Sequence, residues 1–240
     1  MSSAGDSAAA GATGRAAADQ GTPARTVITI DGPAASGKSS VARALAGQLG
    51  FAYVSSGLLY RAATFVAMGA GVDESDEDAL LGLLAHRAVT LTPDALGNRV
   101  SVDGEDVTAG LHTDAVDVRV STVAKHGRVR DWVNERLREL GGSFVIDGRD
   151  MGTVVFPDAA AKFYLTADPR IRAERRASER GSDLDAIAAE LERRDERDRS
   201  QSVPAADATV VDTGNMSLDE VVARVRADVL RALQDAAVAG

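Results

Sequence analysis

The feature that most constrains the fold of this chain is a glycine-rich segment, GPAASGKS, at residues 32–39. It matches the phosphate-binding pattern G-x-x-x-x-G-K-[ST] at every defined position. A β-branched run, VITI at 27–30, precedes it, and residues 39–49 carry apolar side chains at helical spacing. Strand, loop and helix in this order are the context in which the pattern binds phosphate. The segment therefore predicts a nucleoside triphosphate site at the end of a buried strand.

The residue types of this loop suit phosphate chemistry. Glycines let successive backbone N–H groups turn toward a phosphate, and the helix N-terminus adds partial positive charge. Lys38 is expected to reach the β- and γ-phosphates from a solvent-open cradle, and the Ser39 hydroxyl to face Mg²⁺. The predicted triphosphate-binding residues are Gly32, Pro33, Ala34, Ala35, Ser36, Gly37, Lys38, Ser39 and Ser40. The loop alone does not identify the phosphate acceptor.

Strands and helices alternate along the rest of the chain, which predicts an α/β fold with a parallel-sheet core and helices on both faces. The expected strands lie at 27–30, 51–56, 143–147, 161–166 and 207–211. The expected helices lie at 39–49, 58–68, 76–87, 113–124, 127–140 and 169–199, the last broken near 181–183. A final helix should start at a capping box of Ser217 and Glu220 and bury a stripe of Leu218, Val221, Val222, Val225 and Val229.

One internal segment, 89–108, departs from this alternation. Apolar and polar residues alternate in VTLT and RVSV, and turn residues separate the short runs. Asp103-Gly104 is a signal for a two-residue hairpin. The segment predicts a small antiparallel insertion outside the parallel sheet.

Composition and charge exclude several classes of protein. The 240-residue chain has no cysteine, which excludes disulfides, thiolate nucleophiles and Cys-ligated zinc. A net charge of -9 argues against a broad polyanion-binding surface, and no apolar run is long enough to span a bilayer. Residues 1–25, rich in Ala, Gly and Ser, predict a disordered tail without the apolar stretch of a signal peptide. We expect a cytoplasmic protein that acts on small molecules, not on nucleic acid or membranes.

The helix expected at 169–199 is rich in arginine. The i,i+4 pairs Arg175–Glu179, Glu190–Arg194 and Asp195–Arg199 would make most of these residues ordinary surface charges. The break near 181–183 instead favours a helix–turn–helix flap that closes over a triphosphate and excludes water. A separate arginine, Arg61, follows the second strand, where a guanidinium suits phosphate binding. Spacing alone would place it on a solvated helix face.

The segment VIDGRDMGTVVF at 145–156 places two carboxylates and a guanidinium on a turn after a strand. Asp147, Arg149 and Asp150 could bind metal, bind phosphate, read a base or pair with one another. Asp147 suits a magnesium-bound water and the cap of a turn about equally well. The sequence lacks the Asn-Lys-x-Asp string that regulatory GTPases need, and motor ATPases are usually larger. A nucleotide-binding switch without transfer activity stays an alternative.

Six strings occur in a fixed order: GPAASGKSS, SGLLYR, DGEDVT, GRVR, DGRDMGTVVFPDA and RRDERDR. Together they closely resemble the bacterial cytidylate kinase family, the P-loop nucleoside monophosphate kinases that phosphorylate CMP and dCMP with ATP. The resemblance covers about residues 26–230, and DGRDMGTVVFPDA is its most specific string. It implies a kinase domain at 26–240, active in pyrimidine nucleotide metabolism and monomeric. The implied parts are a core at 26–60, 141–169 and 200–240, a monophosphate-binding region at about 61–140 and a mobile lid at about 170–199.

The resemblance also implies roles for individual residues. Arg61 would hold the CMP phosphate with Ser56 beside it, and Asp198 the sugar hydroxyls. The full implied CMP site is Ser56, Arg61, Ser121, Arg130, Arg149, Asp150, Arg194 and Asp198. The implied catalytic residues are Lys38, Arg149 and the lid arginine Arg175, and the implied Mg²⁺ residues are Ser39 and Asp147. Two positions depart from the family pattern: Ser55, often Asp or Asn-like, and Gln201, an Arg in some members.

Cytosine chemistry gives the DGRD turn a specific expectation. Cytosine shows an N4 amino donor where uracil shows an acceptor oxygen, so a carboxylate at Asp150 would favour cytosine. No convincing general base is found in the chain, and phosphoryl transfer to CMP needs none. A phosphate monoester has a second pKa near ~6 and is mostly ionised at pH 7. The expected catalysis is alignment and charge neutralisation by Lys38, Mg²⁺ and arginines.

Overall fold

The computed structural model describes residues 25–93, 97–181, 183–199 and 201–239. The predicted tail at 1–25 lies outside this part, except for Arg25. Among the described residues, none of the helices combines the length and apolar character needed to cross a membrane.

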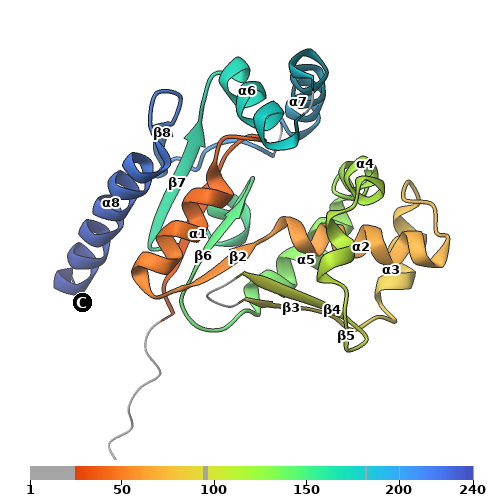
Figure 1. The fold of residues 1–240 in the computed structure, drawn as a ribbon. Helices are drawn as coiled ribbons and strands as arrows, with labels where there is room; N and C mark the ends of the chain where they lie inside the picture. Colours follow the sequence, from red (N-terminus) through yellow and green to blue (C-terminus); the bar gives the residue numbers. More distant parts are fainter. Residues whose placement is uncertain (1–24, 94–96, 182, 200, 240) are drawn as a thin grey trace, which may run out of the picture.

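Five parallel strands form the central sheet in the spatial order β2-β6-β1-β7-β8 (Figure 1). They are β1 (Val27–Asp31), β2 (Ala52–Ser55), β6 (Phe144–Gly148), β7 (Ala161–Thr166) and β8 (Thr209–Asp212). All five predicted strands are present, and the last starts two residues later than expected. Because parallel strands end at the same edge of a sheet, polar residues at their carboxyl ends are brought together there.

Helices cover both faces of this sheet, as predicted. They include α1 (Lys38–Leu49), α2 (Gly57–Ala70), α5 (Gly127–Arg138) and α8 (Leu218–Ala239). Val145 of β6 packs in one core with α1 and α8, whereas its neighbours Phe144 and Ile146 pack in a second core with α2 and α5. Successive strand residues point to opposite faces, and a parallel sheet buried on both faces needs apolar residues on both.

The predicted antiparallel insertion is a three-stranded sheet of β3 (Val89–Pro93), β4 (Asn98–Val102) and β5 (Glu105–Asp106). Asp103 and Gly104 have φ values of 52° and 87°, the left-handed backbone that a two-residue hairpin turn requires. Asn98 fastens the insertion to the central sheet. Its side chain accepts from the Ser55 N–H at 3.1 Å and donates to the Tyr53 carbonyl at 3.0 Å.

Six further elements complete the described part of the chain. They are α3 (Glu77–Leu84), the 3₁₀ helix η1 (Thr108–His112), α4 (Asp114–Val123), the π-helical turn η2 (Met151–Val155), α6 (Pro169–Arg180) and α7 (Leu184–Asp198). The expected helix–turn–helix is confirmed: α6 ends at Gly181, whose φ is 62°, and α7 starts after the N-cap Asp183. Figure 1 shows this pair beyond the tip of β7, next to the loop that leads into α1.

Three details differ from the sequence-based expectations. Leu218 is 46% exposed, because it is the first residue of α8 and lies before the part that packs on the sheet. The helix expected at 76–87 ends at Leu84. The pair Asp195–Arg199 is wrong: Asp195 pairs at 2.6 Å with the buried Arg172 of α6, which attracts it across the helix pair. The capping box of α8 is confirmed by the hydrogen bonds between Ser217 and Glu220.

Candidate active site

The glycine-rich loop has the backbone geometry of a phosphate cradle. Gly32 has a φ of 151°, and a Cβ there would collide with the Leu165 carbonyl oxygen. Gly37, the N-cap of α1, has a φ of 87°. These positions need glycine because side chains rarely adopt such φ values, and the loop delivers the N-terminus of α1 to the carboxyl edge of the sheet.

Lys38 lies deeper than expected. It was predicted in a solvent-open cradle, but its residue is only 8% exposed and its Nζ donates to the Pro33 carbonyl at 3.0 Å. Burial, and then the charge of Arg149, hold the pKa of Lys38 well below its ordinary value. The loop folds back over the side chain and so places the amine inside the site. An anionic ligand would favour the charged form of such a buried amine.

Ser39, Asp147 and Tyr53 form a hydrogen-bonded group at the start of α1. The Ser39 hydroxyl donates to Oδ2 of Asp147, and the buried Tyr53 hydroxyl donates to Oδ1 at 3.1 Å. Burial, and then the negative charge of Asp147, raise the pKa of Tyr53. A hydroxyl and a carboxylate are suitable oxygen ligands for Mg²⁺, which takes its other ligands from phosphates and water. In the described ranges, no group of three or more His, Asp or Glu residues could hold a metal ion by itself.

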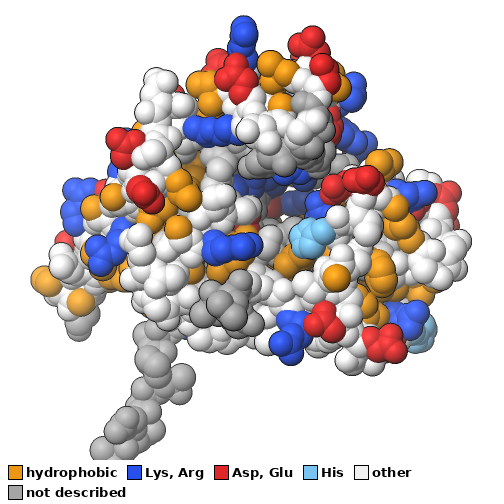
Figure 2. Space-filling view, in the orientation of Figure 1, with side chains coloured by type: hydrophobic (Ala, Val, Ile, Leu, Met, Phe, Trp, Pro, Cys, Tyr) orange, Lys and Arg blue, Asp and Glu red, His pale blue; other side chains and the backbone are white. Residues whose placement is uncertain are grey.

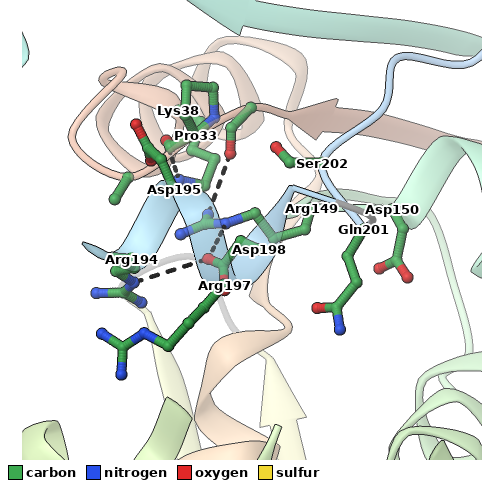
Figure 3. Close-up of polar contacts among 12 residues, drawn as sticks. Pro33, Lys38, Arg149, Asp150, Arg194, Asp195, Arg197, Asp198, Gln201 and Ser202 are labelled. Carbon is green, nitrogen blue, oxygen red and sulfur yellow. Dashed lines mark hydrogen bonds and ion pairs between the residues drawn. The ribbon is translucent and has the colours of Figure 1, made fainter. Parts of the chain in front are cut away.

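Arg149 bridges the loop and α7. Its Nη1 donates to the Gly32 carbonyl at 3.1 Å, and its Nε lies 3.0 Å from Oδ2 of Asp198 (Figure 3). Arg194 approaches the same carboxylate oxygen at 3.9 Å. The alternative that Arg149 pairs with Asp147 is not observed, because the two side chains have different partners. Burial, and then the charge of Arg149, lower the pKa of Arg194 to about 10.

Asp150 pairs with Arg130 of α5, whose Nη1 also donates to Oε1 of Gln201 at 2.8 Å. Figure 3 shows the side chains of Asp150 and Gln201 extending in the same direction. Asp150 is buried, and this burial raises its pKa, although Arg130 opposes the shift. The carboxylate, guanidinium and amide thus form one polar group contributed by three separate segments.

Asp31, at the end of β1, was not identified from the sequence. Its Oδ1 accepts the Met151 N–H at 2.9 Å and its Oδ2 accepts the Gly152 N–H at 2.8 Å. Burial raises its pKa to about 6, and the nearby Asp150 adds to the shift. The only sequence signal was that an aspartate follows a run of β-branched residues. Strand periodicity does not distinguish such an aspartate from the polar residue at an ordinary strand end.

A cavity of about 280 Å³ joins the phosphate loop to the Asp150–Arg130 pair. Lys38, Ser39 and Asp147 line it on one side, and the eight residues of the predicted CMP site also line it: Ser56, Arg61, Ser121, Arg130, Arg149, Asp150, Arg194 and Asp198. Figure 2 shows Lys and Arg side chains inside the hollow between the parts of the molecule. The fold therefore brings together residues that lie as much as 160 positions apart.

Arg61 is held in this cavity by two contacts. Its Nη1 donates to the Leu111 carbonyl at 2.8 Å, and its Nη2 lies 2.5 Å from Oδ1 of Asp117. Its side chain is only 17% exposed, so the solvated-face interpretation does not describe it. The guanidinium is oriented by α4 and the 3₁₀ helix before any ligand arrives.

The structure does not bring Arg175 to the cavity. Its Nη1 and Nη2 donate to Oγ1 and the carbonyl of Thr213, at 3.0 and 2.6 Å. The adjacent Arg176 lines the cavity together with Leu191 of α7. Neighbouring helix residues point about 100° apart, so a one-residue difference in register decides which arginine faces the cavity.

Comparisons with known proteins agree with this geometry. The family model described as cytidylate kinase matches residues 28–231. The chain is 59% identical over 207 residues to a cytidylate kinase of Thermus thermophilus, covering 86% of this chain and 100% of the relative. It is 56% identical over 203 residues to a cytidylate kinase of Deinococcus radiodurans, covering 85% of this chain and 98% of the relative.

A more distant solved structure shares the fold. It is a gluconokinase from Sinorhizobium meliloti, 17% identical, with a TM-score of 0.50, and the match covers 90% of this chain and 97% of that one. At this identity the likeness concerns the fold alone.

Proposed function

Because the chain belongs to the cytidylate kinase family, we propose that it transfers the γ-phosphoryl group of ATP to CMP and dCMP, giving CDP and dCDP. The observation that carries this proposal is the shared cavity: Lys38 of the phosphate loop and the Asp150–Arg130 pair line the same space. A triphosphate on the loop and a base on the pair would bring donor and acceptor phosphates together between them.

The part of the cavity near Asp150 and Arg61 binds the base and the phosphate of the acceptor nucleotide. Asp150 accepts a hydrogen bond from the cytosine N4 amino group, and Arg130 orients its carboxylate. Arg61 receives the CMP phosphate, since α4 and the 3₁₀ helix hold its guanidinium in the cavity wall. Ser56 and Ser121 line the same space, and Asp198 accepts from the sugar hydroxyls.

The donor side neutralises the charge of the transferred group. Lys38, Arg149 and Arg194 surround the space beyond the loop, and Arg176 of α6 adds a fourth cation in place of Arg175. Ser39 and Asp147 would hold Mg²⁺, which would supply positive charge against the phosphates. No general base is required, because the acceptor phosphate is already ionised.

Closure of α6 and α7 would complete the site. Arg149 joins the loop to Asp198 at the end of α7, so bound phosphates would compete for its guanidinium and shift α7. Leu191 and Arg194 of α7 would then cover the phosphates and exclude water. In this proposal α6 and α7 are the lid, and the protein works as a cytoplasmic monomer on small molecules.

A panel of acceptors tests the function. The purified chain is incubated with ATP and Mg²⁺ and each of CMP, dCMP, UMP, AMP and GMP, and nucleotides are separated by chromatography. We expect CDP and dCDP with equal amounts of ADP, and much less product from the others. ATP binding without transfer would instead support a nucleotide-dependent switch. A preference for a purine acceptor would contradict the role given to Asp150.

A further inference from the structure

We propose that Asp31 is a positioning residue for base selection: its carboxylate fixes the turn that carries Arg149 and Asp150. This inference rests on the proposed function, in which that turn reads cytosine. Asp31 lies at the end of β1, directly before Gly32 of the phosphate loop. It is therefore the point at which the phosphate side and the base side of the cavity are joined.

The contact consists of two hydrogen bonds to consecutive amides. Oδ1 of Asp31 accepts from Met151 at 2.9 Å and Oδ2 accepts from Gly152 at 2.8 Å. These are the two residues that follow Asp150. An acceptor with two oxygens binds both N–H groups at once, so it fixes the direction in which the main chain leaves Asp150.

Two glycines near this contact, Gly148 and Gly152, leave no room for a side chain. Gly152 permits the contact, because a Cβ there would lie 2.8 Å from Oγ1 of Thr29 and 3.4 Å from Oδ2 of Asp31. Gly148 is equally constrained, since a Cβ there would collide with the side chain of Met151. The main chain on both sides of Arg149 and Asp150 is thus packed against buried atoms. The Asp31 carboxylate holds it there through the hydrogen bonds to Met151 and Gly152.

A buried charge at this position does not serve stability. Asp31 is 5% exposed, and burial together with the nearby Asp150 works against its ionised form, whereas the Gly152 and Met151 amides, and then Lys38, favour it. Lys162 of β7, also close to Gly152, pairs with Asp207. A neutral side chain would avoid the desolvation cost, and what the carboxylate adds in return is the pair of hydrogen bonds to the Met151 and Gly152 amides.

The side chain is not needed for the phosphate loop itself. The backbone of Asp31 pairs with Gly148 of β6 and Tyr164 of β7 whatever side chain it carries. A substitution at Asp31 should therefore leave the strand and the loop in place and release the turn. This separates the proposal from a general structural role.

Asp31→Asn and the matched control Thr29→Val test the proposal. Asparagine has the same shape but offers one acceptor, so its NH₂ group would face one of the two amides. Thr29 lies on the same face of β1 beside Gly152, and its hydroxyl is buried without a hydrogen-bond partner. The control removes that hydroxyl and leaves both amide contacts intact. For each protein, kcat and KM are measured with CMP, UMP and ATP, the Kd of CMP by calorimetry, and Tm by thermal unfolding.

We expect Asp31→Asn to raise the KM and Kd of CMP about fivefold or more, and to lower the CMP/UMP ratio of kcat/KM at least threefold. The KM of ATP should stay within about twofold, and Thr29→Val should resemble the wild type throughout. Equal losses with CMP and UMP, an effect on ATP alone, or a lower Tm with unchanged CMP values would overturn the proposal.

A second variant covers the case in which Asp31→Asn does not fold. Gly152→Ala pushes the turn away from Asp31 while the carboxylate stays, because its methyl group would lie 2.8 Å from Oγ1 of Thr29, a fully buried and stiff β-branched side chain. It should lower the CMP/UMP ratio in the same way, and an unchanged ratio would refute the proposal. The wild-type panel is measured first, so a failure of the proposed function shows as absent transfer to CMP before any variant is compared.

Discussion

Replacing Asp150 by asparagine should reverse the polarity of the group that meets the base edge. The wild-type carboxylate only accepts hydrogen bonds, which suits the N4 amino group of cytosine and opposes O4 of uracil. The amide of Asp150→Asn can instead donate to O4. We expect kcat/KM for CMP to fall and kcat/KM for UMP to stay level or rise.

The burial of the pair sets the magnitude. The side chains of Asp150 and Arg130 are 7% and 16% exposed, so a hydrogen bond from N4 to this carboxylate is little screened. A charge-assisted bond of this kind contributes about 1.5–3 kcal/mol, or roughly ten- to a hundredfold in kcat/KM. Stability should fall by less than the roughly 3–5 kcal/mol of a broken buried pair, because Gln201 still accepts from Arg130 at 2.8 Å.

The assay measures kcat/KM for CMP and UMP at saturating ATP, with Asp131→Asn as the control. Asp131 is the exposed neighbour of Arg130 on α5, so its loss removes a carboxylate without touching the pair. The control should keep the wild-type CMP/UMP ratio. An equal fall for both nucleotides in Asp150→Asn would refute base reading by Asp150 and make it a residue that only orients Arg130.

Three further predictions follow from the site. Lys38→Ala should lower kcat by about 100- to 1,000-fold without lowering Tm, because it removes a desolvated charge; near-normal turnover would contradict the role of the loop. Arg176→Ala should lower kcat about tenfold or more, with little change in the KM of CMP, in steady-state kinetics. Arg175→Ala should mainly lower Tm in thermal unfolding, because it loses two hydrogen bonds to Thr213. The reverse result would restore Arg175 as the lid arginine. In the folded protein the pKa of Asp31 is raised from 3.8 to about 6, so the Asp31 carboxyl binds its proton more tightly in the folded than in the unfolded chain. The wild type should therefore lose stability as pH rises from about 4 to 6. Relative to Asp31→Asn, its unfolding free energy in urea should fall by about 3 kcal/mol over that range, and parallel pH profiles would contradict the buried carboxylate.

The local patterns of the chain were sufficient for most of the secondary-structure elements. The loop at 32–39, the hairpin at Asp103-Gly104 and the capping box at Ser217 are confirmed, because each depends on residues within a few positions of one another. The eight predicted CMP residues line one cavity, although their individual roles stay predictions. They could be named because whole strings resembled a family, not because spacing placed them together.

The sequence by itself thus determined an α/β fold with a strand–loop–helix segment of the phosphate-binding pattern, and it predicted base reading by the DGRD turn. Tertiary structure decided which side chains meet: Lys38 became buried, Asp195 paired with Arg172, and Arg176 faced the cavity instead of Arg175. It also revealed Tyr53 behind Asp147 and Asp31 beneath the DGRD turn, contacts that span 94, 120 and 121 positions of the chain. Such contacts depend on the order and register of parallel strands, which periodicity along a single strand does not encode.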